Sequence, residues 1–426
     1  MNNEENNIKE IIIKEKANLE LPGLLSKLAD MNKIYLIADE NTFDAAGEDI
    51  YKLLNEENYQ VKNLVLQGEK IVADTDYLFK VFNNVSRDGY FLACGSGTIN
   101  DLTRYVSYKL EQPYLVAATA PSMDGYASPV SPITVDGVKA TYNAVIPEAV
   151  VADTEVLKDA PWKMIQAGFG DLLGKISALM DWKLSNIIFG EDLIGEAISL
   201  VERELLRLIS NRSGLKERAV ESIGTLTRGL INSGIAMQIT GSSRPASGTE
   251  HHISHFLEMY GEIYEQDLPP HGVKVALGEY FAAQMYLKLY ETDFSKFKNS
   301  DDYETRKQRI KENYLSRSEP VLATLKERWP NHQLDINILQ EKEEDIKKLI
   351  QENFKYLNNM NNYLDEMGIF SRKDVKSIDK EWLINAVQSA FEIRNRYTVA
   401  NLLYQIGLLE EWSYEMVDKF KKNVNS

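Results

Sequence analysis

The stretch YFLACGSGTINDLTRY, Tyr90 to Tyr105, joins an apolar run to a helical pattern through two glycines. The run before the glycines predicts a buried strand, and the polar residues after Gly97 open a helix. Glycine lets a backbone turn sharply and approach a ligand closely, and the N–H groups at a helix start favour a pyrophosphate. The stretch therefore predicts a cradle for a cofactor diphosphate. The alternative is a strand-to-helix turn that merely needs glycine, because the full Gly-x-Gly-x-x-Gly fingerprint is not present.

The residues around this stretch repeat the same alternation of strand and helix patterns. Three further apolar runs alternate with amphipathic segments: residues 33–39, 61–67 and 113–119. This alternation is typical of βαβ units and a parallel sheet. Residues 133–144 predict a β-hairpin that turns at Asp136-Gly137, and helical periodicity then runs to Ser426. We expect an α/β dinucleotide-binding domain over residues 1–155 with a parallel sheet and a hairpin, and an all-α domain over residues 156–426 with a C-terminal helical extension.

Composition excludes several classes of protein. The chain has 426 residues, 44% of them hydrophobic, a formal net charge of −16 and one cysteine, Cys94. The acidity argues against a nucleic-acid partner, and a single cysteine excludes an intrachain disulfide framework and a multi-cysteine zinc site. The first residues are acidic and amide-rich, without the features of a signal peptide, and no segment approaches the length of a membrane span. We expect a cytoplasmic globular protein.

Two further features support a nucleotide site in the first domain. The polar loop TAPSMDGYASP, Thr119 to Pro129, follows the next predicted strand at the same end of the sheet, where open α/β sheets bind ligands. Asp39 ends an earlier strand, where its carboxylate would accept hydrogen bonds from the adenosine ribose of NAD. The alternative for Asp39 is a helix N-cap in the sequence DENT.

Histidines cluster in SGTEHHISH, Ser247 to His255, which holds three of the five in the chain. On a helix, His251 and His255 share one face and His252 and His255 can also be neighbours, but His251 and His252 point about 100° apart, so at most two of the three converge. His271 lies at the start of the next apolar helix and offers an imidazole from another direction. With the carboxylate of Asp171, these residues predict an N/O site suited to zinc, iron or nickel. The alternatives are ordinary helix histidines and an N-cap role for Asp171.

The motifs GSGTIND, TAPSMDGYASP, GFGDLLGK, SRPASGTEHHISH and HGVKVALG occur in this order. Together they resemble the glycerol-1-phosphate dehydrogenase family, particularly its bacterial branch, within the metal-dependent polyol dehydrogenases and dehydroquinate synthases. The resemblance covers roughly residues 30 to 290, and SRPASG followed by EH is its most specific part. It implies a dehydroquinate synthase-like fold and NAD(P)H-linked interconversion of dihydroxyacetone phosphate and sn-glycerol 1-phosphate. It also implies a homodimer and a role in phospholipid or sugar-linked metabolism.

The same resemblance assigns roles to individual residues. It implies that Asp171, His251 and His271 hold one nickel or zinc ion. Catalytic roles fall on Asp124 and His255 at the substrate, and on Asp171. It requires no histidine at position 252. Contacts to NAD(H) or NADP(H) are implied for Gly97, Thr98, Ile99, Asn100, Asp101, Thr119, Ala120, Pro121, Ser122 and Ser128, beside the ribose contact predicted for Asp39.

Several questions stay open at this level. Arg244 and Lys175 are candidates for binding the substrate phosphate, although Arg244 could equally brace its own loop. Three other functions compete: a dehydroquinate synthase-like lyase, a dehydrogenase for an unphosphorylated polyol such as glycerol, and a nucleotide-binding protein without catalysis. The sequence does not choose between NAD and NADP.

Overall fold

The structure is a computed structural model that describes residues 8–29, 31–135, 138–297 and 302–425. Its internal contacts divide the chain into two compact units. The first unit comprises Met1–Leu172 and Leu206–Gln238, and the second comprises Leu173–Leu205 and Ile239–Ser426. The predicted domain boundary near residue 155 stays a prediction, and the predicted Asp136-Gly137 turn lies outside the described residues.

The first unit is built on a six-stranded sheet in the order β1-β8-β5-β4-β2-β3, with all neighbouring strands parallel. A separate antiparallel hairpin, β6-β7, lies after β5 in the chain. The predicted fold class, a parallel sheet with a hairpin followed by a helical region, is confirmed. The strands are β1 (Glu10–Lys14), β2 (Lys33–Asp39), β3 (Gln60–Leu66), β4 (Tyr90–Gly95), β5 (Tyr114–Ala118), β6 (Val130–Val135), β7 (Val138–Asn143) and β8 (Ala149–Asp153).

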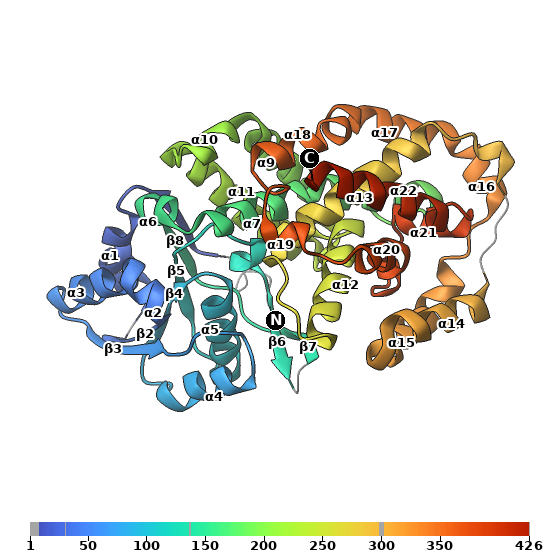
Figure 1. Cartoon of the computed structure of the whole chain (residues 1–426). Coiled ribbons are helices and arrows are strands. Elements are labelled where there is room, and N and C mark those ends of the chain that lie inside the picture. Colours follow the sequence, from blue (N-terminus) through green and yellow to red (C-terminus); the bar gives the residue numbers. More distant parts are fainter. Residues whose placement is uncertain (1–7, 30, 136–137, 298–301, 426) are drawn as a thin grey trace. The chain divides into compact units, whose positions relative to one another are not determined.

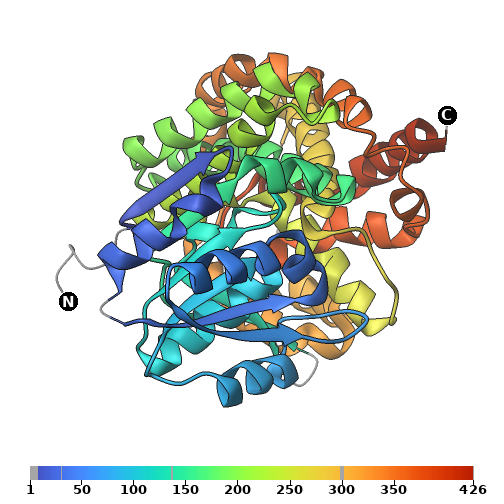
Figure 2. The same ribbon diagram turned by 90° about the vertical axis from the view of Figure 1, so that its left-hand side faces the viewer.

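Helices cover both faces of this sheet. On one face, alternate strand residues such as Leu36 and Leu92 are buried against Leu25 and Ile50 of two helices. These helices, α1 and α3, lie on one side of the strands in Figure 1, and α5 lies on the other. In Figure 2 the side with the blue helices faces the viewer. Burial on both faces explains why the central strands are continuous apolar runs. The helices of this part are α1 (Leu21–Leu28), α2 (Glu40–Thr42), α3 (Glu48–Glu56), α4 (Thr75–Asn84), α5 (Gly97–Leu110), α6 (Thr154–Asp159), α7 (Trp162–Leu173), α10 (Ser213–Lys216) and α11 (Val220–Thr240).

The strand order reverses between β2 and β4. From β2 the chain moves outward to β3, and it then returns across β2 to start β4 on the other side. Ile37 pairs with Ala93, so Asp39 and Gly95 both lie two residues further toward the carboxyl ends. Open α/β sheets bind ligands at this kind of switch point. Asp39 and the glycine turn therefore meet at the edge of the sheet where a nucleotide site is expected.

Two strands, β1 and β8, were missing from the sequence prediction. Both are five-residue runs: β1 is an edge strand that pairs with β8, and β8 is fully buried. A short apolar run cannot be told from a helical segment by periodicity alone, and β8 leads directly into the helix that begins at Thr154. The sheet is therefore two strands wider than the sequence indicated.

The second unit is helical: in the part that the structure describes, no strand follows β8. Its central element is α13 (His271–Tyr290), which is buried over nearly its whole length and packs on α12, α8 and α17. Gly278 permits the close approach of α12, because a Cβ there would lie 2.2 Å from the carbonyl oxygen of Glu250. The other helices are α8 (Lys175–Phe189), α9 (Gly195–Asn211), α12 (Thr249–Ile263), α14 (Tyr303–Tyr314), α15 (Ser318–Arg328), α16 (Ile336–Glu341), α17 (Glu343–Asn358), α18 (Met360–Glu366), α19 (Lys373–Lys376), α20 (Lys380–Ser389), α21 (Val399–Gln405) and α22 (Leu409–Asn425).

None of the helices in the described ranges is both long enough and apolar enough to span a membrane.

The single cysteine offers a test of the first unit. Cys94 is fully buried in β4, and its Sγ donates to the carbonyl of Thr42. Burial, with a smaller effect of Asp39, raises the pKa of the thiol to about 12. Since the thiolate is the reactive form, we expect no reaction with Ellman's reagent at pH 8 in the native protein. One equivalent should react in denaturant; rapid labelling of the native protein would contradict the burial of β4.

Candidate functional site

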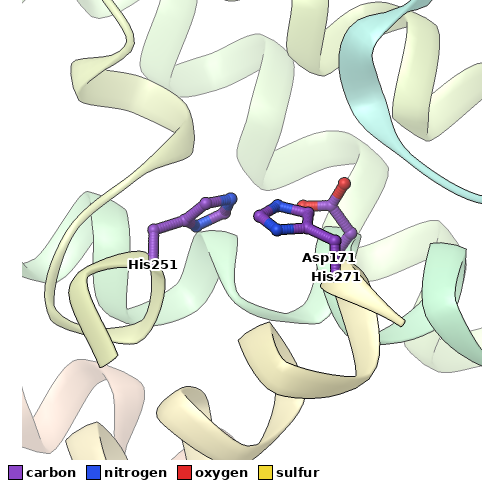
Figure 3. Close-up of side chains that lie close together, drawn as sticks. All are labelled: Asp171, His251 and His271. Atoms are coloured by element: carbon purple, nitrogen blue, oxygen red, sulfur yellow. The ribbon is translucent and has the colours of Figure 1, made fainter. Parts of the chain in front are cut away.

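Three side chains that are far apart in the sequence lie close together. Asp171, His251 and His271 each offer one ligand atom, and these atoms lie within 4.8 Å of one another. Asp171 is in the last turn of α7, His251 is in the first turn of α12 and His271 begins α13. Figure 3 shows the imidazoles of His251 and His271 facing each other, with the Asp171 carboxylate close to His271. A carboxylate and two imidazoles are a donor set that binds divalent transition metals.

Of the two histidine pairs on α12 that helical spacing allows, the structure brings His251 and His255 together. The ring centres of His251 and His255 are 6.0 Å apart, and they lie 5.3 and 5.6 Å from that of His271. His252 points elsewhere and is fully buried, and neither of its ring nitrogens has a hydrogen-bond partner in the described residues. Burial and the nearby charge of Arg396 hold the pKa of His252 well below its ordinary value. His252 is therefore a neutral core residue, apart from the three clustered imidazoles.

Glu258 holds two of these rings. Its Oε1 lies 2.8 Å from Nδ1 of His271, and its Oε2 lies 3.3 Å from Nδ1 of His255. Lys274 forms an ion pair with Oε1 at 3.3 Å. A carboxylate at Nδ1 favours the tautomer with the proton there, which leaves Nε2 as the nitrogen that can bind a metal.

Glu258 also forms a second group of metal-binding residue types, with His255 and His271. The hydrogen bonds argue against a metal at that point, because both histidines present Nδ1, the protonated nitrogen, to Glu258. We therefore assign Glu258 to ring orientation and keep Asp171, His251 and His271 as the candidate ligands.

Glu250 plays the same part for His251. Its Oε1 lies 2.8 Å from Nδ1 of His251, and it also accepts from Gly248 N and Ser177 Oγ. Burial raises the pKa of Glu250, but the hydrogen bonds to His251 and Gly248 and the charge of Lys175 outweigh this and leave the pKa lowered. Glu250 is therefore an ionised carboxylate inside the second unit.

Two neighbouring carboxyl groups behave differently. Burial and the charge of Glu250 raise the pKa of Glu279 well above its ordinary value. Burial likewise raises the pKa of Asp181 to about 6, although Tyr286, Thr249 and Val399 donate hydrogen bonds to it. One negative charge, on Glu250, is thus favoured in this cluster at the expense of the other carboxyl groups.

Asp171 is positioned from within the first unit. Its Oδ2 accepts the backbone N–H of Asp124 at 3.0 Å, and Asp124 Oδ2 accepts from Ser233 Oγ at 2.9 Å. Gly168, three residues before Asp171, permits a close approach of the loop after β5, because a Cβ there would lie 1.8 Å from the carbonyl oxygen of Pro121. The loop that contains Asp124 therefore packs directly on α7.

The predicted cofactor residues lie at the carboxyl ends of β4 and β5. Gly97 and Thr98 are half-buried in the first turn of α5, whose first N–H groups have no partner within the helix. Thr119 N donates to the carbonyl of Gly95 at 3.2 Å, which ties the loop after β5 to the glycine turn. The set also contains Ile99, Asn100, Asp101, Ala120, Pro121, Ser122 and Ser128.

Several of these side chains already have structural partners. Asn100 is buried and accepts from the Tyr114 hydroxyl, and Asp101 pairs with Arg104 at 3.0 Å. Asp39 caps α2, since its Oδ1 accepts Thr42 N at 2.8 Å. This is the N-cap that the sequence offered as the alternative for Asp39, and it uses one of the two carboxylate oxygens. The cofactor contacts of these residues stay predictions.

The two candidates for phosphate binding are both engaged in the second unit. Arg244 donates Nε to Glu191 at 2.8 Å and also bonds the carbonyl of Tyr397. Lys175 is fully buried, and its Nζ donates to the carbonyl of Ala246 at 3.0 Å. Of the two roles considered for Arg244, the structure shows the one in which it braces its loop.

The sequence prediction missed Glu250 and Glu258. Glu258 is three residues after His255, a spacing at which helical side chains are neighbours, whereas Glu250 immediately precedes His251, a spacing that does not predict a contact. A glutamate on an amphipathic helix is ordinarily exposed, however, and nothing in the sequence marks these two as enclosed.

The chain is similar in sequence to known dehydrogenases. The model of the family "Iron-containing alcohol dehydrogenase" matches residues 12–161. The chain is 34% identical to the glycerol-1-phosphate dehydrogenase [NAD(P)+] of Bacillus subtilis over 67% of this chain and 73% of that protein. It is 35% identical to the protein of the same name from Bacillus velezensis, over 66% of this chain and 72% of that one.

Solved structures resemble the whole chain. Glycerol dehydrogenase from Schizosaccharomyces pombe matches with a TM-score of 0.59 and 16% identity, over 97% of this chain and 92% of that one. This likeness defines the fold class, that of the glycerol dehydrogenases. The protein belongs to the iron-containing alcohol dehydrogenase and glycerol-1-phosphate dehydrogenase family, and the resemblance seen in the sequence is confirmed.

The position of Glu258 predicts a change in metal affinity. Glu258→Gln removes a charge that faces two Nδ1–H groups and leaves one acceptor oxygen, so we expect divalent-metal affinity to fall roughly 10- to 100-fold. Titration of the metal-free protein with Zn²⁺ or Ni²⁺ by calorimetry measures this. Glu262→Gln, the same change at an exposed position on the same helix, is the control. Equal affinities of the two variants would show that Glu258 does not orient the ligands.

Proposed function

We propose that this protein is a metal-dependent NAD(P)-linked dehydrogenase that interconverts dihydroxyacetone phosphate and sn-glycerol 1-phosphate. The observation that carries the proposal is the convergence of Asp171, His251 and His271, with a carboxylate behind each imidazole. The relatives that share about a third of the sequence bear this activity in their names and support the choice of substrate.

The donor set fits a divalent ion, for which nickel and zinc are the candidates. Such an ion, when bound, supplies a Lewis acid that stabilises negative charge on the substrate's carbonyl oxygen. Asp171, His251 and His271 would hold it. Glu250 and Glu258 keep the rings in one tautomer and orientation, and the backbone N–H of Asp124 does the same for Asp171.

The first unit offers a binding surface for NAD(H) or NADP(H). The glycine turn, the start of α5 and the loop after β5 lie at the carboxyl ends of adjacent strands. The N–H groups in the first turn of α5 favour a pyrophosphate, and Asp39 lies at the switch point on the neighbouring strand. The reacting hydride comes from the reduced cofactor, while the protein positions the two reactants.

His255 and Asp124 are the candidates for moving a proton or binding a substrate hydroxyl. Burial lowers the pKa of His255 to about 4, and the charges of His271 and Arg394 add to this against the opposing effect of Glu258. His255 is therefore a neutral imidazole at pH 7, with Nδ1 directed at Glu258. We also propose a homodimer, which the family resemblance implies.

The proposal is tested by oxidation of NADH and NADPH with dihydroxyacetone phosphate, using the metal-loaded and metal-stripped protein. We expect turnover only with metal. His271→Ala should lose bound metal and about 10³-fold or more of activity, because a ligand of the Lewis acid is removed. NADH binding, followed by fluorescence, should persist because the predicted nucleotide residues lie in the first unit.

His332→Ala, the same change at a half-buried histidine that packs between Phe189 and Tyr397 outside the cluster, is the control for His271→Ala. Full activity of the metal-stripped protein would overturn the metal assignment. Turnover with glycerol but not with the phosphate ester would identify an unphosphorylated polyol dehydrogenase. Elimination of phosphate without net consumption of NADH would identify a dehydroquinate synthase-like lyase.

A further inference from the structure

The segment between η8 (Ala390–Glu392) and α21 is fixed in place beside α12. Arg396 Nη1 donates to the carbonyl of Ser247 at 2.9 Å, just before α12 begins. The carbonyl of Tyr397 accepts from Arg244, and Val399 N donates to Asp181 at 2.8 Å. On the other side, Arg328 donates to the carbonyl of Phe391 at 2.7 Å. Residues 393–398 therefore have a defined position next to the histidine helix.

Arg394 stands out within this segment. In the described ranges of the chain its guanidinium has no hydrogen-bond acceptor and no carboxylate partner, and the residue is exposed. The two other arginines whose charges reach the same side of α12 are both engaged, Arg244 by Glu191 and Arg396 by Ser243 and Ser247. Arg394 is thus the member of this group whose donors remain available to a ligand.

Arg394 lies next to the histidine helix: η8, which ends two residues before it, packs on α12, and Arg396, two residues after it, donates to the carbonyl of Ser247. The positive charge of Arg394 contributes to lowering the pKa of both His255 and His252, after the larger effect of their burial. Desolvation by the surrounding protein lowers the pKa of Arg394 itself, although solvent reaches the residue. A charged group that is accessible and yet partly enclosed is suited to a small anion, because the enclosure strengthens the electrostatic attraction.

Resting on the proposed function, we infer that Arg394 binds the phosphate group of the three-carbon substrate whose other end reaches the metal ligands. Guanidinium is planar and offers paired N–H donors that match two phosphate oxygens. In a protein with a net charge of −16, a cation without an ion-pair partner beside His255 is a specific attraction for an anion. Arg394 thereby distinguishes a phosphorylated substrate from the corresponding free polyol.

The test compares Arg394→Gln and Arg394→Lys with the native enzyme, all metal-loaded. We expect Arg394→Gln to raise the KM for dihydroxyacetone phosphate roughly 10- to 100-fold, because charge-assisted hydrogen bonds are lost. The ratio of kcat/KM for dihydroxyacetone phosphate to that for dihydroxyacetone should fall by a similar factor. Arg394→Lys should recover part of this ratio, since it keeps the charge and loses the paired donors.

Arg87→Gln is the matched control. Arg87 is exposed and lies before β4, at the end of the sheet opposite to the glycine turn, so it should keep the native ratio. Inorganic phosphate serves as a second probe: calorimetry should detect binding to the native protein and to Arg87→Gln, and at least tenfold weaker binding to Arg394→Gln.

The outcomes separate this inference from the proposed function. If the native enzyme turns over dihydroxyacetone phosphate and Arg394→Gln has an unchanged KM, the inference is wrong and the function stands. A second outcome is that the native enzyme does not act on dihydroxyacetone phosphate, yet binds inorganic phosphate that Arg394→Gln does not bind. In that case the anion site stands and the proposed function is wrong. A rise in the KM for NADPH alone would assign Arg394 to the cofactor's phosphate and overturn the inference.

Discussion

One carboxylate, Glu258, fixes two imidazoles at the candidate metal centre. It meets Nδ1 of His271 at 2.8 Å and Nδ1 of His255 at 3.3 Å, and Lys274 balances its charge. A histidine that is not held in this way can rotate and can carry its proton on either nitrogen, which weakens it as a ligand. Glu250 repeats the arrangement for His251 from inside the helical unit. The site therefore depends as much on two glutamates as on the three residues with ligand atoms.

The two units position their candidate site residues in different ways. In the first unit the strand order is decisive, because the reversal between β2 and β4 brings Asp39 and the glycine turn to one edge of the sheet. Thr119 N, in the next loop, donates to the carbonyl of Gly95 in that turn. In the second, close helix packing is decisive. Gly278 lets α13 approach the backbone of Glu250, so His251 and His271 are carried by two helices with little freedom to separate.

Much of this could be predicted from the sequence where a local pattern has a direct physical meaning. The strands ending at Asp39 and Gly95 were visible as apolar runs, and the spacing of His251 and His255 placed them on one face. β1 and β8 were missed because a short apolar run cannot be told from a helical segment by periodicity alone. Glu250 and Glu258 were missed because burial is a property of the tertiary structure. The N-cap of Asp39 and the bracing role of Arg244 were foreseen only as alternatives, since each depends on a partner that the sequence does not identify.

The connection between α20 and α21 links the C-terminal part of the chain to the start of α12. Arg396 donates to the carbonyl of Ser247 before α12, the carbonyl of Tyr397 accepts from Arg244, and Val399 N donates to Asp181. A truncation that ends before this connection would strip hydrogen bonds from the start of the histidine helix and uncover buried carboxyl groups. The connection between α20 and α21 is thus part of the support of α12. Shortened or chimaeric versions of the protein must retain it to preserve the geometry of this helix.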